Sequence, residues 1–179
     1  MKVIAFAASS SKYSINKMLV TYVAGLLQNC EVEILDLNDY ELPLFSVDRE
    51  NELGHPDLAK AFFNKIGQSD ALIISFAEHN GSYTAAYKSL FDWCSRIDSK
   101  VFQNKPMFLL STSPGSRGGA TVLATASASA QFFGGHVKAS ISVPSFNQNF
   151  DLETERIINP EINIQIVNTL HTFIESINT

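Results

Sequence analysis

Short apolar segments recur along the chain and predict the strands of a sheet. They are Val3–Ala8, Val32–Leu37, Ala71–Phe76, Met107–Leu110 and Val137–Val143. Most are rich in β-branched or large apolar residues, which is typical of strands that are buried on both faces. We therefore expect a sheet that is covered by helices on both sides.

Helical patterns lie between these segments, with apolar residues recurring three and four positions apart. The expected helices cover Ile15–Leu27, Leu58–Ile66, Tyr83–Ile97, Ala120–Phe133 and Ile166–Ile177. A strand followed by a helix, repeated five times, predicts an α/β fold with a parallel sheet. Since no repeat or linker interrupts the pattern, we expect residues 1–179 to form a single domain.

Two connections are longer than this scheme requires. They run over residues 38–56 and 144–160, and both contain proline. Long connections in a compact domain usually serve a binding function or subunit assembly. The sequence does not indicate which of these roles applies here.

Composition and charge limit the classes of partner. Of 179 residues, 45% are apolar and 17% are charged, which is typical of a globular protein. The net charge of −5 gives no general attraction for nucleic acid or for anionic lipid. A membrane-spanning helix needs about 20 apolar residues, and no stretch of the sequence provides them. We therefore expect neither a nucleic-acid partner nor a membrane partner.

Cysteine and histidine usage argues against disulfides and metals. Cys30 and Cys94 are too few for a disulfide scaffold, so we predict reduced thiols and a cytoplasmic location. The four histidines are scattered, and the sequence has no H-E-x-x-H and no C-x-x-C motif. We expect no metal site.

A cluster of hydroxyl groups follows the first predicted strand. Ser9, Ser10, Ser11 and Ser14 precede or open the first expected helix, and Asn16 lies just inside it. Hydroxyls and free backbone N–H groups at a helix N-terminus favour an anion such as a phosphate monoester. Simple helix capping is the alternative, although one serine would satisfy it. Neither the G-x-G-x-x-G fingerprint nor a P-loop occurs in the chain.

Polar loops also follow the third and fourth predicted strands, over residues 77–83 and 111–119. Asn80–Gly81 is a strong turn signal, and the glycines of the second loop would let backbone approach a flat ligand. Because ligands bind at the carboxyl ends of strands in an open α/β sheet, the loops predict a site for a ligand with a phosphate end and a planar end. The alternative is that all three are ordinary turns.

These loops resemble the motifs of the NAD(P)H-dependent FMN reductase family, which includes quinone, azo-dye and chromate reductases. The family motif G-S-x-R-x-x-S-x-N matches residues 8–16, with Ala8 in place of glycine and Ser11 in place of arginine. P-E-Y-N-G-S appears as residues 77–82, with His79 in place of tyrosine. The Ser-x-Gly-x-x-Gly-Gly loop appears as residues 113–119.

The resemblance implies both a fold and an activity. The fold is a flavodoxin-like three-layer sandwich, with a five-stranded parallel sheet in the order 2-1-3-4-5 and helices on both faces. The activity is transfer of electrons from NADPH or NADH to bound FMN, and then to a quinone or a similar small acceptor. The cofactor-binding residues implied are Ser9, Ser11, Ser14, Ile15, Asn16, Ala77, Glu78, His79, Asn80, Ser113 and Gly115.

The resemblance assigns no catalytic side chain, because the flavin carries the chemistry. Ser11 offers one hydroxyl where the family arginine offers a charged fork, and Lys12 or Lys17 could supply the charge instead. Two alternatives stay open. One is a flavodoxin-like electron carrier that binds the same FMN, and the other is a flavin-free interaction module on the same fold.

The helix expected over Tyr83–Ile97 suggests self-association. Its apolar arc covers roughly 160°, which is wider than a helix facing only its own core requires. Tyr83, Tyr87 and Phe91 extend this arc. We expect a homodimer or homotetramer; the alternatives are a helix sunk deeply between its neighbours and aromatic rims that touch the flavin.

Overall fold

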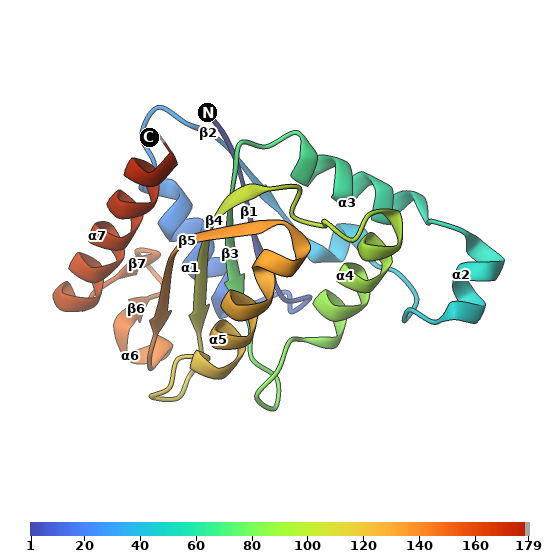
Figure 1. Ribbon diagram of the computed structural model, residues 1–179. Coiled ribbons are helices and arrows are strands. Elements are labelled where there is room, and N and C mark those ends of the chain that lie inside the picture. The colour runs from blue at the N-terminus through green and yellow to red at the C-terminus, as the bar shows by residue number, and fades with distance from the viewer. Residues whose placement is uncertain (178–179) are drawn as a thin grey trace.

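The computed structural model describes residues 1–177 and contains a parallel sheet with the predicted strand order (Figure 1). The strands are adjacent in the order β2-β1-β3-β4-β5, and every pair of neighbours is parallel. They are β1 (Lys2–Ala8), β2 (Glu31–Leu35), β3 (Ala71–Phe76), β4 (Lys105–Thr112) and β5 (Gly135–Val143). The predicted flavodoxin-like topology is therefore confirmed.

The central strands are buried on both faces, which explains their continuous apolar sequences. In β1, Ile4 and Phe6 point into one layer of the core, whereas Val3 and Ala5 point into the other. Successive side chains of a strand point to opposite faces, so both layers demand apolar residues. All residues of β3 are buried, including Ser75, which donates a hydrogen bond to the Asn16 side chain at the start of the first helix.

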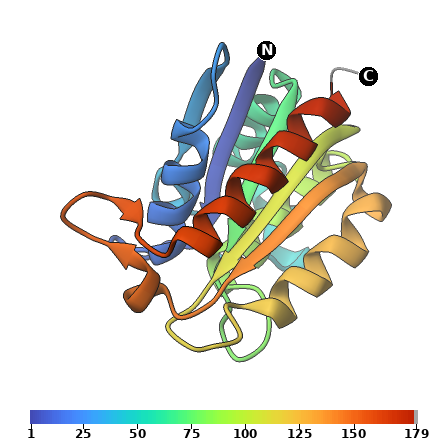
Figure 2. The same cartoon turned by 90° about the vertical axis from the view of Figure 1, so that its left-hand side faces the viewer.

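Helices cover both faces of this sheet (Figure 2). On one face, the core contains residues of α3 (Asp57–Gly67), α4 (Ala85–Ile97) and α5 (Ala120–Ser129). On the other face it contains residues of α1 (Ile15–Gly25) and α7 (Pro160–Ile177). The result is the three-layer arrangement that the sequence predicts.

Several boundaries differ from the predicted ones for local reasons. β2 ends at Leu35 because the Asp36 side chain accepts a hydrogen bond from the Asn38 amide and starts the short 3₁₀ helix η1 (Leu37–Tyr40). The alanine-rich helix α5 ends at Ser129 and is followed by the 3₁₀ helix η2 (Ala130–Phe133). α7 begins already at Pro160, since proline is well suited to the first position of a helix.

Both long connections contain secondary structure of their own. Residues 38–56 include α2 (Val47–Leu53), which has no buried residue and projects from the body at the right of Figure 1. Residues 144–160 include the short helix α6 (Phe146–Asn149). They also include an antiparallel hairpin, formed by β6 (Phe150–Asp151) and β7 (Arg156–Ile157).

The wide apolar arc of α4 is occupied largely by the chain itself. Tyr87 is only 4% exposed and packs against Phe6 and Phe76. Phe91 contacts Phe102 and Phe133. Deep burial, one of the alternatives to self-association, therefore accounts for Tyr87, and the arc by itself does not indicate a subunit interface.

Candidate functional site

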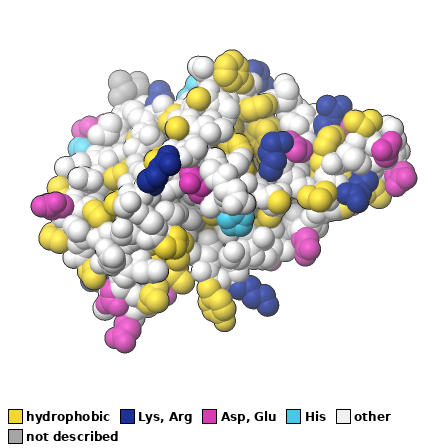
Figure 3. All heavy atoms as spheres, turned by 90° about the horizontal axis from the view of Figure 1, so that it is seen from below, with side chains coloured by type: hydrophobic (Ala, Val, Ile, Leu, Met, Phe, Trp, Pro, Cys, Tyr) yellow, Lys and Arg dark blue, Asp and Glu magenta, His cyan; other side chains and the backbone are white. Residues whose placement is uncertain are grey.

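Loops from the carboxyl ends of β1, β3 and β4 converge on one cavity of about 210 Å³. This edge of the sheet points downward in Figure 1, and Figure 3 shows the molecule from that side. Of the predicted cofactor-binding residues, all except Asn80 and Gly115 line this loop cavity. Its lining is Ser9, Ser11, Tyr13, Ser14, Ile15, Asn16, Ala77, Glu78, His79, Thr112, Ser113 and Pro114.

The β1–α1 loop presents hydroxyls and the N-terminus of a helix to the cavity. Ser14 is the N-cap of α1, and its Oγ accepts a hydrogen bond from the Lys17 amide at 3.2 Å. Ser9 Oγ accepts one from the Ser11 amide, also at 3.2 Å. The first N–H groups of a helix have no partner within the helix, and the first turn of α1 carries no acidic side chain. This end of the cavity therefore suits an anion.

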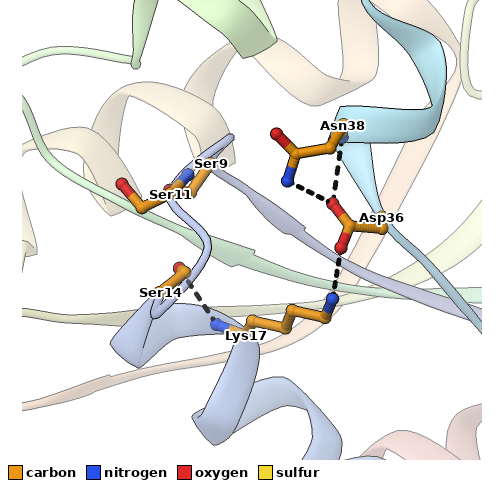
Figure 4. Close-up of polar contacts among 6 residues, drawn as sticks. All are labelled: Ser9, Ser11, Ser14, Lys17, Asp36 and Asn38. Atoms are coloured by element: carbon orange, nitrogen blue, oxygen red, sulfur yellow. Dashed lines mark hydrogen bonds and ion pairs between the residues drawn. The ribbon is translucent and has the colours of Figure 1, made fainter.

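Lys17 does not replace the arginine that the family motif carries at position 11. Its ammonium forms an ion pair with Asp36, and Figure 4 shows its side chain extending away from Ser9 and Ser11. The hydrogen bond from Lys17 holds the pKa of the Asp36 carboxyl below its ordinary value. Among the described residues, no lysine or arginine lines the loop cavity, so hydroxyls and backbone dipoles define its anion end.

Asn16 ties the start of α1 to two strands of the sheet. Its side chain is 3% exposed, and its Nδ2 donates to the Thr112 carbonyl at 3.1 Å. Its Oδ1 accepts hydrogen bonds from Ser75 Oγ at 2.8 Å and from the Thr112 amide at 3.0 Å. The side chain thus joins α1 to β3 and β4. Only the backbone N–H of Asn16 is left to donate a hydrogen bond to an anion.

The second loop is a tight two-residue turn. His79 and Ser82 exchange two backbone hydrogen bonds, of 3.0 and 3.1 Å. Asn80 and Gly81 both have positive φ angles, 52° and 77°, as a type I′ turn requires. Asn80 therefore lies at an exposed tip outside the cavity lining, whereas His79 lies at the cavity itself.

Glu78 fixes the second loop to the third. Its carboxylate Oε2 accepts a hydrogen bond from the Val122 amide at 2.8 Å, in the first turn of α5. Neither Gly119, which caps α5, nor the first residues of the helix provide a side-chain cap, so Glu78 satisfies an otherwise free amide. Its structural task is helix capping across two loops.

The glycines that end the third loop approach the protein's own backbone. Gly118 and Gly119 have φ angles of 57° and 76°. A Cβ atom on Gly118 would lie 2.7 Å from the Val143 carbonyl oxygen of β5. The Ser111 and Ser142 hydroxyls both donate to the Gly118 carbonyl, at 2.7 and 2.9 Å. These two glycines thus allow the third loop to pack closely against β4 and β5.

Ser113 and Gly115 lie earlier in the third loop, and of the two only Ser113 lines the cavity. A Cβ on Gly115 would meet only Ser113 Oγ within 4 Å, at 3.9 Å. Ser113 Oγ donates to the Gly115 carbonyl at 3.3 Å and lines the cavity. Tyr13, Thr112 and Pro114 also line it. The family motifs do not single them out, because Tyr13 and Pro114 fall on variable motif positions and Thr112 lies just before the third motif.

Neither a metal-binding cluster nor a membrane-spanning helix is found among residues 1–177. Among residues 1–177, no three histidine, cysteine or acidic side chains are grouped so that they could hold a metal ion. Over the same residues, no helix is both long enough and apolar enough to cross a membrane.

The doubly wound sheet and the three loops at its carboxyl edge define a protein of the flavodoxin-like class. Residues 1–148 match the family model for NADPH-dependent FMN reductases. The chain belongs to that family, as the loop motifs predict.

Individual relatives agree with this assignment. The quinone reductase of Escherichia coli K12 is 29% identical over 67% of this chain and 64% of its own length. The NADPH:quinone oxidoreductase of Arabidopsis thaliana is 30% identical over 66% of this chain and 61% of its own. The match thus spans less than two thirds of each of these relatives. FerB, a flavoenzyme NAD(P)H:acceptor oxidoreductase from Paracoccus denitrificans, shares the fold, with a TM-score of 0.78, 22% identity and coverage of 99% and 97%.

Membership of this family agrees with the predicted enzyme class, an NAD(P)H-dependent flavin reductase with FMN as cofactor. The assignment of individual residues to the cofactor stays a prediction. The electron acceptor and the oligomeric state of the chain also stay predictions.

Proposed function

We propose that this chain binds FMN in the loop cavity and passes electrons from NADPH or NADH to a quinone or a similar small acceptor. The observation that carries the proposal is the convergence of three polar loops on one cavity, with the N-terminus of α1 at one end. Both named relatives above are quinone-reducing enzymes, which supports turnover over the electron-carrier alternative.

The flavin phosphate would lie against Ser9, Ser11 and Ser14. Their hydroxyls and the first N–H groups of α1 supply several donors, and the helix dipole adds about half a positive charge. Because no cation lines this end among the described residues, the number of donors must compensate for the absence of an arginine.

The flavin ring would lie between the second and third loops, along Ala77–His79 and Thr112–Pro114. Bound FMN supplies the two-electron chemistry that protein side chains lack. The chain's own task is to hold the ring in place with the second loop, which Glu78 joins to α5, and the third loop, which Asn16 joins to α1. At about 210 Å³ the cavity is smaller than a typical enclosing ligand site, so one face of the ring would stay accessible to nicotinamide and acceptor.

Anaerobic reduction tests the activity. FMN-loaded protein mixed with NADPH or NADH should lose its oxidised-flavin absorbance, and a quinone should restore it over repeated cycles. Oxidised flavin that persists for hours under excess of both reductants would favour the electron carrier. A purified protein that binds no FMN at micromolar concentration would favour the flavin-free module.

We also propose that the chain forms a homodimer or homotetramer, and the support now comes from the α2 region instead of α4. Leu44, Val47 and Leu53 of the α2 region are each more than half exposed, on a segment that projects from the body. Such a cluster is typical of an interface. Light scattering should give a mass above the 19.7 kDa of one chain, and Val47→Lys combined with Leu53→Glu should yield a folded monomer. A wild-type protein of one-chain mass at micromolar concentration would contradict this proposal.

The cytoplasmic location is likewise a proposal. It is supported by Cys30 and Cys94, which are both free thiols in the structure.

A further inference from the structure

A larger cavity, of about 780 Å³, lies directly beside the loop cavity. It is bounded by α1 on one side and by the β6–β7 hairpin on the other, which Figure 2 shows projecting next to α1. We refer to it as the α1–hairpin groove. Ser14 lines both cavities, so the groove begins where the phosphate of a bound flavin would end.

The groove is positively charged in a chain whose net charge is −5. Lys12 and Lys17 line it from α1 and the preceding loop, and Arg156 lines it from β7, with Glu155 as the one acidic lining residue described. Lys17 is neutralised by Asp36, which leaves Lys12 of the β1–α1 loop and Arg156 of β7 as the other cations that line the groove. The groove therefore favours an anionic group.

The rest of the groove offers an apolar surface suited to a flat ring. Tyr22 and Phe150 lie edge to face, with ring centroids 6.3 Å apart, and Met18 and Ile157 extend the same surface. The Tyr22 hydroxyl donates to Asn163 Oδ1 at 2.6 Å, which fixes the tyrosine ring against α7. Aromatic side chains held in this way are a common support for a heterocycle.

We propose that the α1–hairpin groove binds an adenosine phosphate, namely the adenylate half of FAD, so that the protein accepts FAD as well as FMN. The proposal rests on the placement of the flavin phosphate at Ser14. In FAD the second phosphate is attached to the phosphate that FMN already has, and here the adjoining groove supplies both cations and an apolar surface. Its volume is within the usual range for a site that holds a nucleotide-sized ligand.

NADPH also carries an adenosine phosphate, so its adenosine 2′-phosphate half is the other ligand that could occupy the groove. The groove meets the loop cavity at its phosphate end, however, whereas the nicotinamide has to reach the ring end, near His79 and Ser113. Continuity of the two cavities thus favours FAD.

Titrations of the full-length apoprotein with FMN, FAD and AMP test the proposal. FAD should bind about tenfold or more tightly than FMN, since at least one charge-assisted hydrogen bond is added. AMP alone should bind and weaken as salt is raised. Arg156→Glu should reduce FAD and AMP affinity by about tenfold or more and leave FMN affinity within about twofold. Lys138→Glu, the same charge change at an exposed position of β5, should alter none of the three affinities.

A steric variant gives a second, independent test. Gly25 lines the groove, and a Cβ built on it has no atom within 4 Å, so a side chain can enter the groove without strain. Gly25→Trp should lower FAD and AMP affinity and leave FMN affinity unchanged.

Equal affinity for FMN and FAD together with no AMP binding would overturn the proposal. It would also be overturned if Arg156→Glu weakened NADPH or 2′,5′-ADP but not FAD, which would assign the groove to the reductant. Failure of FMN to bind would contradict the proposed function instead, and the AMP titration would then still decide whether the groove is an adenylate site.

Discussion

The two ends of the loop cavity are built in opposite ways. At the phosphate end, Ser9, Ser11 and Ser14 surround the start of a helix whose first N–H groups have no partner in the helix. At the ring end, the polar groups are largely used on the protein itself: Glu78 caps α5, and the Gly118 carbonyl accepts two serine hydroxyls. One end presents free donors, and the other presents a backbone surface that its side chains hold rigid.

This difference shows that the polar residues of a loop motif can have either of two roles. Serines at a helix N-terminus can contact a ligand directly, whereas a conspicuous glutamate or glycine pair can serve the loop's own geometry. Substitutions at the first end should therefore change cofactor affinity with little effect on stability. Substitutions at the second end should change stability first.

The largest expected effect is on the phosphate end. Ser14→Asp retains a good N-cap but places a carboxylate beside the flavin phosphate, so FMN affinity should fall by about a hundredfold or more. Ser14→Asn, which caps equally well without charge, should lose much less, and both variants should have a melting temperature close to the wild type. Fluorescence titration of FMN measures the affinities. Equal losses in the two variants would show that the charge does not face a phosphate.

A stability effect should dominate at the ring end. Gly118→Ala forces a side chain into a left-handed conformation and against the Val143 carbonyl, at a cost of about 1–3 kcal/mol. That corresponds to a fall in melting temperature of roughly 2–12 °C for a chain of this size. Gly115→Ala, whose Cβ would make only an ordinary contact with Ser113 Oγ at 3.9 Å, is the matched control and should melt like the wild type. If both variants melt alike, the account of the third loop is wrong.

Restoring the family arginine should strengthen the phosphate end. Ser11→Arg adds a charged donor where no cation lines the cavity among the described residues, so FMN should bind about tenfold more tightly. Ser10→Arg adds the same charge one position away, outside the cavity lining, and should change affinity far less. A weaker complex in Ser11→Arg would mean that the pocket has closed over the serine.

The smallest effect concerns Lys17, which the structure assigns to Asp36. Lys17→Met should lower the free energy of unfolding by less than about 1 kcal/mol at neutral pH, because the pair is partly exposed. The pKa of Asp36 is lowered in the fold, so its contribution is present above its ordinary value of 3.8 and is lost as the pH falls through the lowered pKa. Urea unfolding of both proteins should therefore converge in strong acid. An offset that is independent of pH, or a loss of FMN affinity above about threefold, would contradict this assignment.

Much of the fold follows from sequence because the central strands are buried on both faces. A run such as Ala71–Phe76 has no polar face to expose to solvent, so the sequence predicts an interior strand. The order of the strands was predicted from the resemblance to the FMN reductase family. The polar cluster of the β1–α1 loop could also be found from the sequence, because Ser9 to Asn16 are contiguous and adjoin the start of a helix.

The remaining features depend on contacts between distant segments. Nothing local to Glu78 reveals that its carboxylate caps a helix that begins at Ala120. Likewise, the apolar side of α4 looks like an interface until Phe6 and Phe76 are seen to enclose Tyr87. Arg156 reaches the α1–hairpin groove only because a hairpin forms within a segment that reads as a loop.

The central claim is that the β1–α1 loop holds the phosphate of FMN, and comparison of FMN with riboflavin tests it most directly. The two ligands share the ring and the ribityl chain and differ only in the phosphate. Several charge-assisted hydrogen bonds at Ser9, Ser11, Ser14 and the α1 N-terminus should make FMN bind about a hundredfold or more tightly than riboflavin in the wild-type apoprotein. Equal affinities for the two ligands would contradict the account.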